Sequence, residues 1–132
     1  MRKLVFTLVI VHLLTLACDF TVIAQAKKIS NQELVDLMEK EELQLVDVRT
    51  PEETANGMIE GAQNIDFRSP DFKDYISKLD KNKPVAVYCG AGGRSGKTSQ
   101  MLQELGFKEI YDLSGGFTQW EAEKYPVDGG SR

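Results

Sequence analysis

A single cysteine opens a stretch of the chain in which small residues and one cation follow closely. The stretch reads Cys89-Gly90-Ala91-Gly92-Gly93-Arg94-Ser95. Its glycines let the backbone curl tightly and turn its N–H groups inward as a cradle for an anion. These donors, the amino terminus of a following helix and Arg94 all favour a thiolate over a thiol. The sequence therefore predicts that Cys89 is a nucleophile, and that Gly90 to Ser95 bind its anionic substrate.

Two other interpretations fit parts of this stretch. An unpaired cysteine is often an inert, buried residue, and the glycines would then only make a turn. Residues 91–98 also fit a relaxed phosphate-loop pattern, with Ala91 in place of the first glycine. Nucleotide hydrolysis needs a larger sheet and an acidic strand-end residue for Mg²⁺, for which Asp112 is a poor substitute. We therefore favour a thiol nucleophile.

Residues 1–26 have the composition of a secretory signal peptide. A positive start, Met1-Arg2-Lys3, precedes an apolar run from Leu4 to Ala17, and Ala24-Gln25-Ala26 supplies small residues before a charged pair. We expect cleavage after Ala26, one domain over residues 27–132, and a periplasmic or secreted location.

Cys18 and Asp19 bear on two alternatives at this end of the chain. Thr15-Leu16-Ala17-Cys18 loosely matches a lipid-attachment motif, with Thr15 where leucine is usual, and lipid on Cys18 would anchor the domain to a membrane. A retained transmembrane anchor is less favoured, because Asp19 ends the apolar run short of the ~20 residues that span a bilayer.

Charge and residue counts exclude several functions. The formal charge is −4 and no basic stripe is visible, which argues against nucleic acid as a partner. The only histidine, His12, lies in the predicted signal peptide, so the expected mature domain has no histidine base or ligand. Of two cysteines only Cys89 would remain, which excludes an internal disulfide.

Helical and strand patterns alternate around the loop. Ser30 and Glu33 form a capping-box signature, and Trp120 is expected in the core. Helices are predicted over residues 31–40, 51–55, 69–79, 95–105 and 117–124, strands over 43–48, 84–88 and 109–113, a turn over 57–61, an extended piece over 65–67, and a frayed tail from 128 to 132. This alternation predicts an α/β fold, a parallel sheet with helices on both faces. Ligands of such sheets bind beyond the carboxyl ends of the strands, where Cys89 is expected.

Four stretches of the chain resemble the single-domain rhodaneses, and the likeness covers residues 29–126. They are Leu45-Val46-Asp47-Val48-Arg49-Thr50-Pro51-Glu52-Glu53, Gly57-Met58-Ile59-Glu60-Gly61-Ala62-Gln63-Asn64-Ile65, Val87-Tyr88-Cys89-Gly90-Ala91-Gly92-Gly93-Arg94-Ser95 and Gly115-Gly116-Phe117-Thr118-Gln119-Trp120. The resemblance implies a central parallel sheet of about five strands. Met58 departs from the family, which commonly has histidine at that position.

The resemblance also implies a sulfurtransferase. Cys89 would take the sulfane sulfur of thiosulfate or another donor, hold it as a persulfide, and pass it to cyanide or a thiol, with no metal or cofactor. Arg94 would anchor the donor, while Asp47 and Arg49 would support the site. For Asp47 and Arg49 an ordinary surface ion pair with Glu52 or Glu53 is an equally good interpretation. Lys97 would add positive potential or be a solvated helix residue.

Two alternatives to this activity remain at the level of sequence. One is a periplasmic carrier of persulfide or an anion with little turnover. The other, weaker, is a phosphatase or arsenate reductase, whose loop in this fold has seven residues where Cys89 to Arg94 has six.

Overall fold

Five short strands form a parallel sheet at the centre of the computed structural model, which describes residues 22–40 and 42–129. All four strand pairs are parallel, which confirms the predicted sheet. In spatial order the strands are β1 (Lys27–Ile29), β6 (Ile110–Leu113), β5 (Val85–Tyr88), β2 (Gln44–Asp47) and β4 (Gln63–Asn64).

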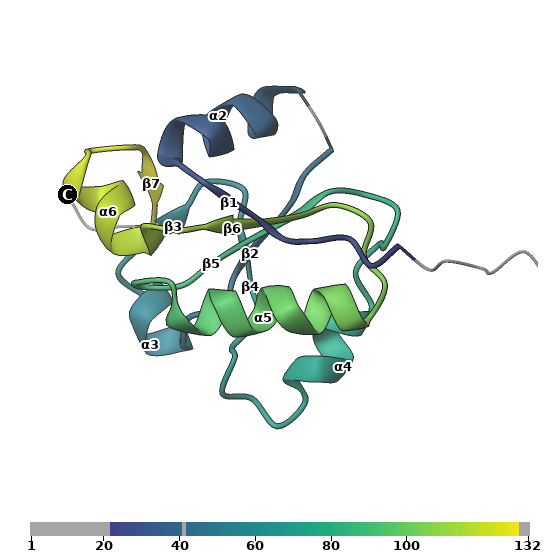
Figure 1. Ribbon diagram of the computed structural model, residues 1–132. Helices are drawn as coiled ribbons and strands as arrows, with labels where there is room; N and C mark the ends of the chain where they lie inside the picture. Colours follow the sequence, from purple (N-terminus) through teal and green to yellow (C-terminus); the bar gives the residue numbers. More distant parts are fainter. Residues whose placement is uncertain (1–21, 41, 130–132) are drawn as a thin grey trace, which may run out of the picture.

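Helices cover both faces of this sheet, as predicted (Figure 1). On one face lie α4 (Phe72–Ser77) and α5 (Gly93–Glu104), and on the other lie α2 (Asn31–Lys40) and α6 (Gly116–Ala122). The short helix α3 (Pro51–Thr54) follows β2 at the carboxyl ends of the strands. The same edge receives the loop after β5 and the amino terminus of α6.

The middle strand β5 shows why the sheet needs two helical layers. All four of its residues are buried. Side chains alternate along a strand, so Val85 and Val87 pack toward α4 and α5, while Ala86 and Tyr88 pack toward α2 and α6. A strand covered on both faces has a continuous apolar run, and that run is what the sequence displays.

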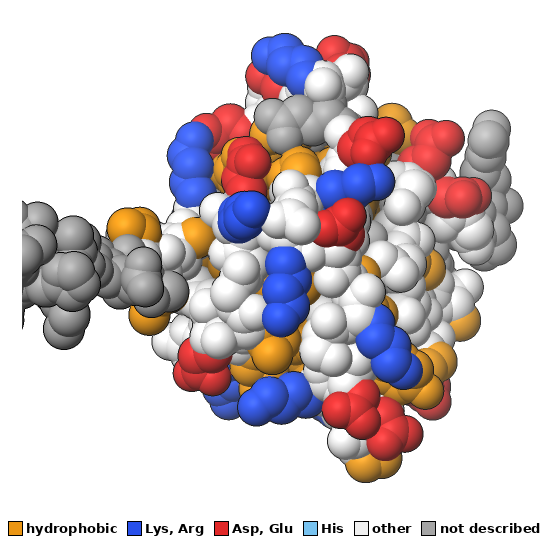
Figure 2. All heavy atoms as spheres, turned by 90° about the vertical axis from the view of Figure 1, so that its right-hand side faces the viewer, with side chains coloured by type: hydrophobic (Ala, Val, Ile, Leu, Met, Phe, Trp, Pro, Cys, Tyr) orange, Lys and Arg blue, Asp and Glu red, His pale blue; other side chains and the backbone are white. Residues whose placement is uncertain are grey.

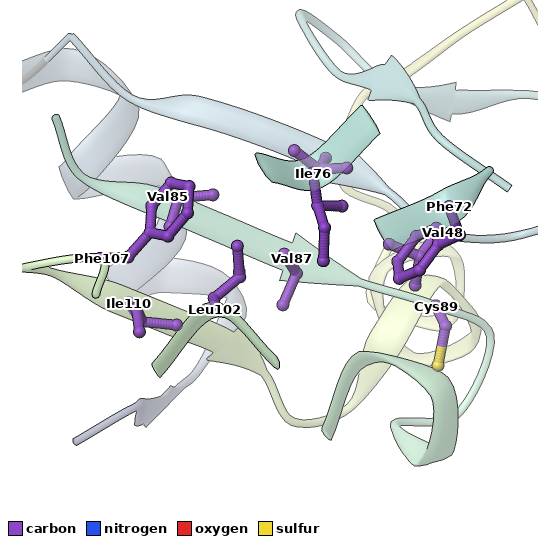
Figure 3. Close-up of a cluster of buried hydrophobic side chains, with 10 residues drawn as sticks. Val48, Phe72, Ile76, Val85, Val87, Cys89, Leu102, Phe107 and Ile110 are labelled. Carbon is purple, nitrogen blue, oxygen red and sulfur yellow. The ribbon is translucent and has the colours of Figure 1, made fainter. Parts of the chain in front are cut away.

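Cys89 continues the first of these two rows of side chains. Figure 3 shows it at the end of the row beyond Val85 and Val87, with its sulfur directed away from the hydrophobic side chains and toward the loop. The strand alternation thus delivers the sulfur to the face that α5 covers.

Several predicted elements are confirmed. The helix over residues 31–40 is α2, capped by Ser30 and Glu33 through a 2.9 Å bond from the Ser30 N–H to the Glu33 carboxylate. Trp120 is in the core, with 2% of its surface exposed.

Other boundaries differ, and each difference has a local cause. Helix α5 begins at Gly93 rather than at residue 95, because Gly92 adopts a positive φ of 102° and ends the loop there. Helix α4 begins at Phe72, since Ser69 and Pro70 form a turn before it. The strand near residues 65–67 lies earlier, at Gln63–Asn64.

Three strands were not predicted, because each has only two or three residues and is held by a distant partner. β1 pairs with β6 at the edge of the sheet. β3 (Met58–Ile59), inside the predicted turn, pairs antiparallel with β7 (Val127–Asp128). Asp128 therefore belongs to a strand and not to a frayed tail.

The amino-terminal segment lies largely outside the described residues, including Cys18 and the predicted apolar run. Of the predicted signal peptide only residues 22–26 are described; there the Gln103 side chain donates a 3.0 Å hydrogen bond to the Ala24 carbonyl. In the portion of the chain that the structure describes, no helix is long and apolar enough to cross a membrane. Figure 2 shows basic and acidic side chains interspersed on the face turned away from the carboxyl ends of the strands.

Candidate active site

The loop after β5 folds so that its backbone N–H groups lie close to the thiol of Cys89. Cys89 has 1% of its surface exposed. The Gly92 N–H donates to its sulfur across 3.1 Å, and the Cys89 thiol donates to the Ser95 hydroxyl across 3.7 Å. Burial by itself would raise the pKa of this thiol, but the backbone N–H groups of Ser95, Gly92 and Ala91, together with the Ser95 hydroxyl, lower it below its ordinary value.

Helix α6 fixes the carbonyl groups of the loop. The Phe117 N–H donates to the Cys89 carbonyl across 2.8 Å, and the Thr118 N–H donates to the Gly90 carbonyl across 3.1 Å. The first N–H groups of a helix have no partner within the helix, and here the loop supplies two acceptors. With these carbonyls held toward α6, loop N–H groups are left to face the sulfur.

Gly116 makes this approach possible. Its φ is 61°, and a Cβ atom at this position would lie 2.4 Å from the Gly90 carbonyl oxygen and 2.7 Å from that of Cys89. No side chain fits there without moving the loop. Gly116, the first residue of α6, is therefore needed for the contact between this helix and the loop.

Arg94 is held by a carboxylate from the neighbouring element. Its two terminal nitrogens donate to the Glu53 carboxylate across 2.6 and 2.7 Å. The Arg94 hydrogen bonds hold the pKa of Glu53 at about 2, against the opposing effect of burial. Glu53 first, and Cys89 to a smaller degree, raise the pKa of Arg94. The predicted donor anchor is thus beside the thiol, but in a bidentate ion pair.

Glu53 was not among the predicted site residues. It caps α3, where the Thr50 N–H donates to its carboxylate across 2.9 Å and its own N–H reaches the Thr50 hydroxyl. The Thr50–Glu53 spacing is a capping-box signature that was visible in the sequence. The partnership with Arg94 was not visible, because the two residues are 41 positions apart.

Asp47 and Arg49 form a buried ion pair, so the alternative of a surface pair with Glu52 or Glu53 is wrong. Their side chains are 0% and 5% exposed, and the shortest N–O distance is 2.7 Å. Arg49 also donates to the Gly57 carbonyl and lies 3.8 Å over the Phe117 ring. The pair is on the sheet face opposite the Cys89 sulfur, where it joins β2, the following turn and α6.

Lys97 has no hydrogen bond or ion pair with the Cys89 loop among the described residues; it is the fourth residue after Gly93, where α5 begins. It lines a groove behind the loop together with Lys28 and Asp112. Residues 93–98 are already helical, so the relaxed phosphate-loop pattern does not fold as an extended loop.

Met58 lies in β3, outside the loop after β5. Across residues 22–40 and 42–129, no group of three or more His, Cys, Asp or Glu side chains is placed to hold a metal ion.

The fold and the site together define a single-domain α/β protein with one thiol in a backbone cradle at the carboxyl edge of a parallel sheet. Residues 30–123 match the model of the family described as rhodanese-like domain, and the chain belongs to this family.

Named relatives agree with this assignment. The chain is 38% identical over 96 residues to thiosulfate sulfurtransferase GlpE of Coxiella burnetii. These residues make up 73% of this chain and 88% of that protein. It is 35% identical to the protein of that name from Shewanella oneidensis, over 71% of this chain and 91% of that one. A rhodanese-related protein from Thermoplasma volcanium superposes with a TM-score of 0.69 at 30% identity, over 78% of this chain and 98% of that one.

Proposed function

We propose that this protein is a sulfurtransferase that moves sulfane sulfur from thiosulfate or a persulfide to a thiophilic acceptor through a persulfide on Cys89. The observation that carries the proposal is the sulfur itself, buried against inward N–H groups and with a lowered pKa. Relatives named thiosulfate sulfurtransferase at 33–38% identity support the same donor class.

The first half of the proposed cycle forms the persulfide. The Cys89 thiolate attacks the outer sulfur of thiosulfate, a new S–S bond forms, and the bond to the sulfonate sulfur breaks, so that sulfite leaves with the electron pair. Arg94 has N–H donors beyond those that Glu53 accepts, and these can bind the sulfonate oxygens.

In the second half the loop holds an anionic sulfur. The terminal atom of the persulfide carries the charge, and the N–H groups of the cradle, from Gly90 to Ser95, stabilise it as an oxyanion hole stabilises oxygen. Attack by cyanide on that atom gives thiocyanate and returns the Cys89 thiolate; an acceptor thiolate gives a new persulfide in the same way. No proton needs to be taken from Cys89 by another side chain once it is ionised.

The burial of the nucleophile favours sulfur transfer over phosphate hydrolysis. In thiosulfate the attacked atom is the narrow terminal sulfur, whereas in a phosphate ester it is the central atom of a tetrahedral group. A cysteine with 1% of its surface exposed is reached more easily by the former. The six residues from Cys89 to Arg94 support the same choice.

Steady-state assays test the proposal. We expect thiocyanate to form from thiosulfate and cyanide, and Cys89→Ser to lower the rate by at least about a thousandfold, because the nucleophile is lost. Cys18→Ser, compared with Cys89→Ser in the full chain, is the matched control and should retain the rate. Full activity in Cys89→Ser, or hydrolysis of an aryl phosphate in place of sulfur transfer, contradicts the proposal. A chain that gains one sulfur but does not turn over would instead be the persulfide carrier.

We further propose that residues 1–26 direct export, with cleavage after Ala26 and a mature domain over residues 27–132 in the periplasm or outside the cell. The small residues before the Lys27-Lys28 pair support this cleavage site. The mass of the processed chain tests it, since lipid on Cys18 gives a larger mass that is lost in Cys18→Ser. A chain that keeps Met1 in the cell contradicts export.

A further inference from the structure

Asp112 is a buried carboxyl group that the proposed cycle does not use. It lies on β6, in register with Val87 of β5 on one side and Lys28 of β1 on the other. Only 5% of its surface is exposed, and its Oδ1 atom has no hydrogen-bond partner among the described residues. An unpartnered buried carboxyl oxygen is costly, which suggests that this group has a role.

Strand alternation places the Asp112 side chain on the sheet face that carries Cys89 and α5. Its register partner Val87 belongs to the row of side chains that ends in Cys89. The Asp112 Oδ2 atom lies 3.9 Å from where a Cβ atom of Gly96 would be, so the carboxyl group packs against the first turn of α5. That turn also carries Ser95.

Ser95 is a neighbour of both the thiol and the carboxyl group. It is fully buried, and its hydroxyl is 3.7 Å from the Cys89 sulfur and donates to the Gly92 carbonyl across 3.2 Å. Burial raises the pKa of Asp112 above its ordinary value, although the neighbouring Ser95 side chain and the charge of Lys28 act in the opposite direction. The single proton of this hydroxyl therefore has three nearby acceptors: the Gly92 carbonyl, the Cys89 sulfur and the Asp112 carboxyl group.

The far side of Asp112 opens on a groove of about 490 Å³. The charged side chains that line this groove with Asp112 are Lys28, its register partner on β1, and Lys97 on α5, and Val87 is its neighbour on β5. Ser99, one turn after Ser95, also lines this groove, and within the described chain its hydroxyl has no partner. The carboxyl group can thus exchange protons at the back of the loop without passing the thiol.

We propose that Asp112 is a positioning residue that limits the stabilisation of the Cys89 thiolate through the Ser95 hydroxyl. While Asp112 is ionised, it attracts the Ser95 proton, which is then less available to the sulfur, and its charge opposes a second anion. The effect is useful because a thiolate that is stabilised too strongly is a weaker nucleophile. This inference rests on the proposed function only in treating Cys89 as the attacking group.

The ionisation of Cys89 tests this directly, measured as the pH midpoint of iodoacetamide alkylation of the Cys89 peptide in the full chain. We expect Asp112→Asn, which keeps the shape and removes the charge, to lower the midpoint by roughly one pH unit. In a Ser95→Ala background the same substitution should lower it by less than half as much. An unchanged or raised midpoint, or an equal shift in both backgrounds, would overturn the proposal.

A second pair of variants covers the case in which Asp112→Asn does not fold. Lys28→Met removes an exposed ammonium that offsets the carboxylate, so the Cys89 midpoint should rise by a few tenths of a pH unit. Lys27→Met, the neighbouring residue on β1, should leave it unchanged. Equal midpoints for these two variants contradict the proposal. Alkylation needs no sulfur donor, so loss of sulfur transfer with these shifts intact would count against the proposed function alone.

Discussion

The pKa of the Cys89 thiol is lowered by the backbone and by one hydroxyl. The only histidine in the sequence, His12, is far from it along the chain and outside the described residues. The N–H groups of Ser95, Gly92 and Ala91 overcome the effect of burial and lower the pKa of the thiol. Because Arg94 is paired with Glu53, its net contribution to the charge of the site is smaller than that of a free arginine.

Glu53 gives a prediction about acid stability. Its pKa is lowered to about 2 in the folded protein, so the folded state binds this proton less readily than the unfolded chain does. The stabilisation is therefore present above the ordinary pKa of a glutamate and is lost as the pH falls toward 2. We expect Glu53→Gln to remove this part of the pH dependence, measured as the free energy of unfolding in urea between neutral pH and pH ~2.5.

Glu121→Gln is a matched control for this measurement, because Glu121 is an exposed glutamate on α6. It should retain the acid dependence of the unsubstituted chain. If Glu53→Gln loses stability with acid as steeply as Glu121→Gln, the ion pair with Arg94 does not contribute to folding.

Among the helices and strands, α6 supports the site by packing closely against the loop after β5, whose carbonyl groups it binds. At Gly116 this approach leaves no room for a side chain. We expect Gly116→Ala to destabilise the protein by about 2 kcal/mol or more, because the new Cβ atom would overlap two carbonyl oxygens and the backbone conformation is strained for alanine. Chemical denaturation measures this loss.

Gly93→Ala is the comparison for Gly116→Ala. Gly93 is the first residue of α5, and apart from its chain neighbours and the backbone of its own helix no atom lies within 4 Å of its added Cβ. Alanine favours helix over glycine, so stability should be unchanged or higher by up to ~1 kcal/mol. Equal losses for the two substitutions would mean that the close approach of α6 is not what restricts Gly116.

Elements with a clear local pattern could be predicted, and those held by distant partners could not. The capping box at Ser30 fixed the start of α2, and the apolar run into Cys89 fixed β5. β3 and β7 have two residues each, too few for any periodicity, and exist because residues about 70 positions apart pair with one another. The Glu53–Arg94 pair and the placement of Asp112 behind Ser95 depend on the same kind of long-range contact.

The buried pair of Asp47 and Arg49 connects several elements on one face of the sheet. Arg49→Ala would leave the Asp47 carboxylate buried without its cation, so we expect a loss of about 3–5 kcal/mol in the free energy of unfolding. Lys27→Ala breaks an exposed pair with Glu33 and should cost less than ~1 kcal/mol. Similar, small losses for both would contradict a bracing role for Arg49.

The two faces of the sheet carry different parts of the candidate site and its support. One face, under α4 and α5, carries the thiol, Ser95 and Asp112, while the other carries the Asp47–Arg49 pair and the aromatic packing of Phe117. Helix α6 connects them, because its first N–H groups bind the loop and its Phe117 ring lies under Arg49. Substitutions on the second face should therefore affect the site mainly through folding.

The intact mass of the protein, measured after incubation with thiosulfate and removal of excess donor, tests the Cys89 persulfide most directly. We predict a gain of one sulfur atom on Cys89, lost again on addition of cyanide and absent in Cys89→Ser. An unchanged mass, or the same gain in Cys89→Ser, would contradict a Cys89 persulfide.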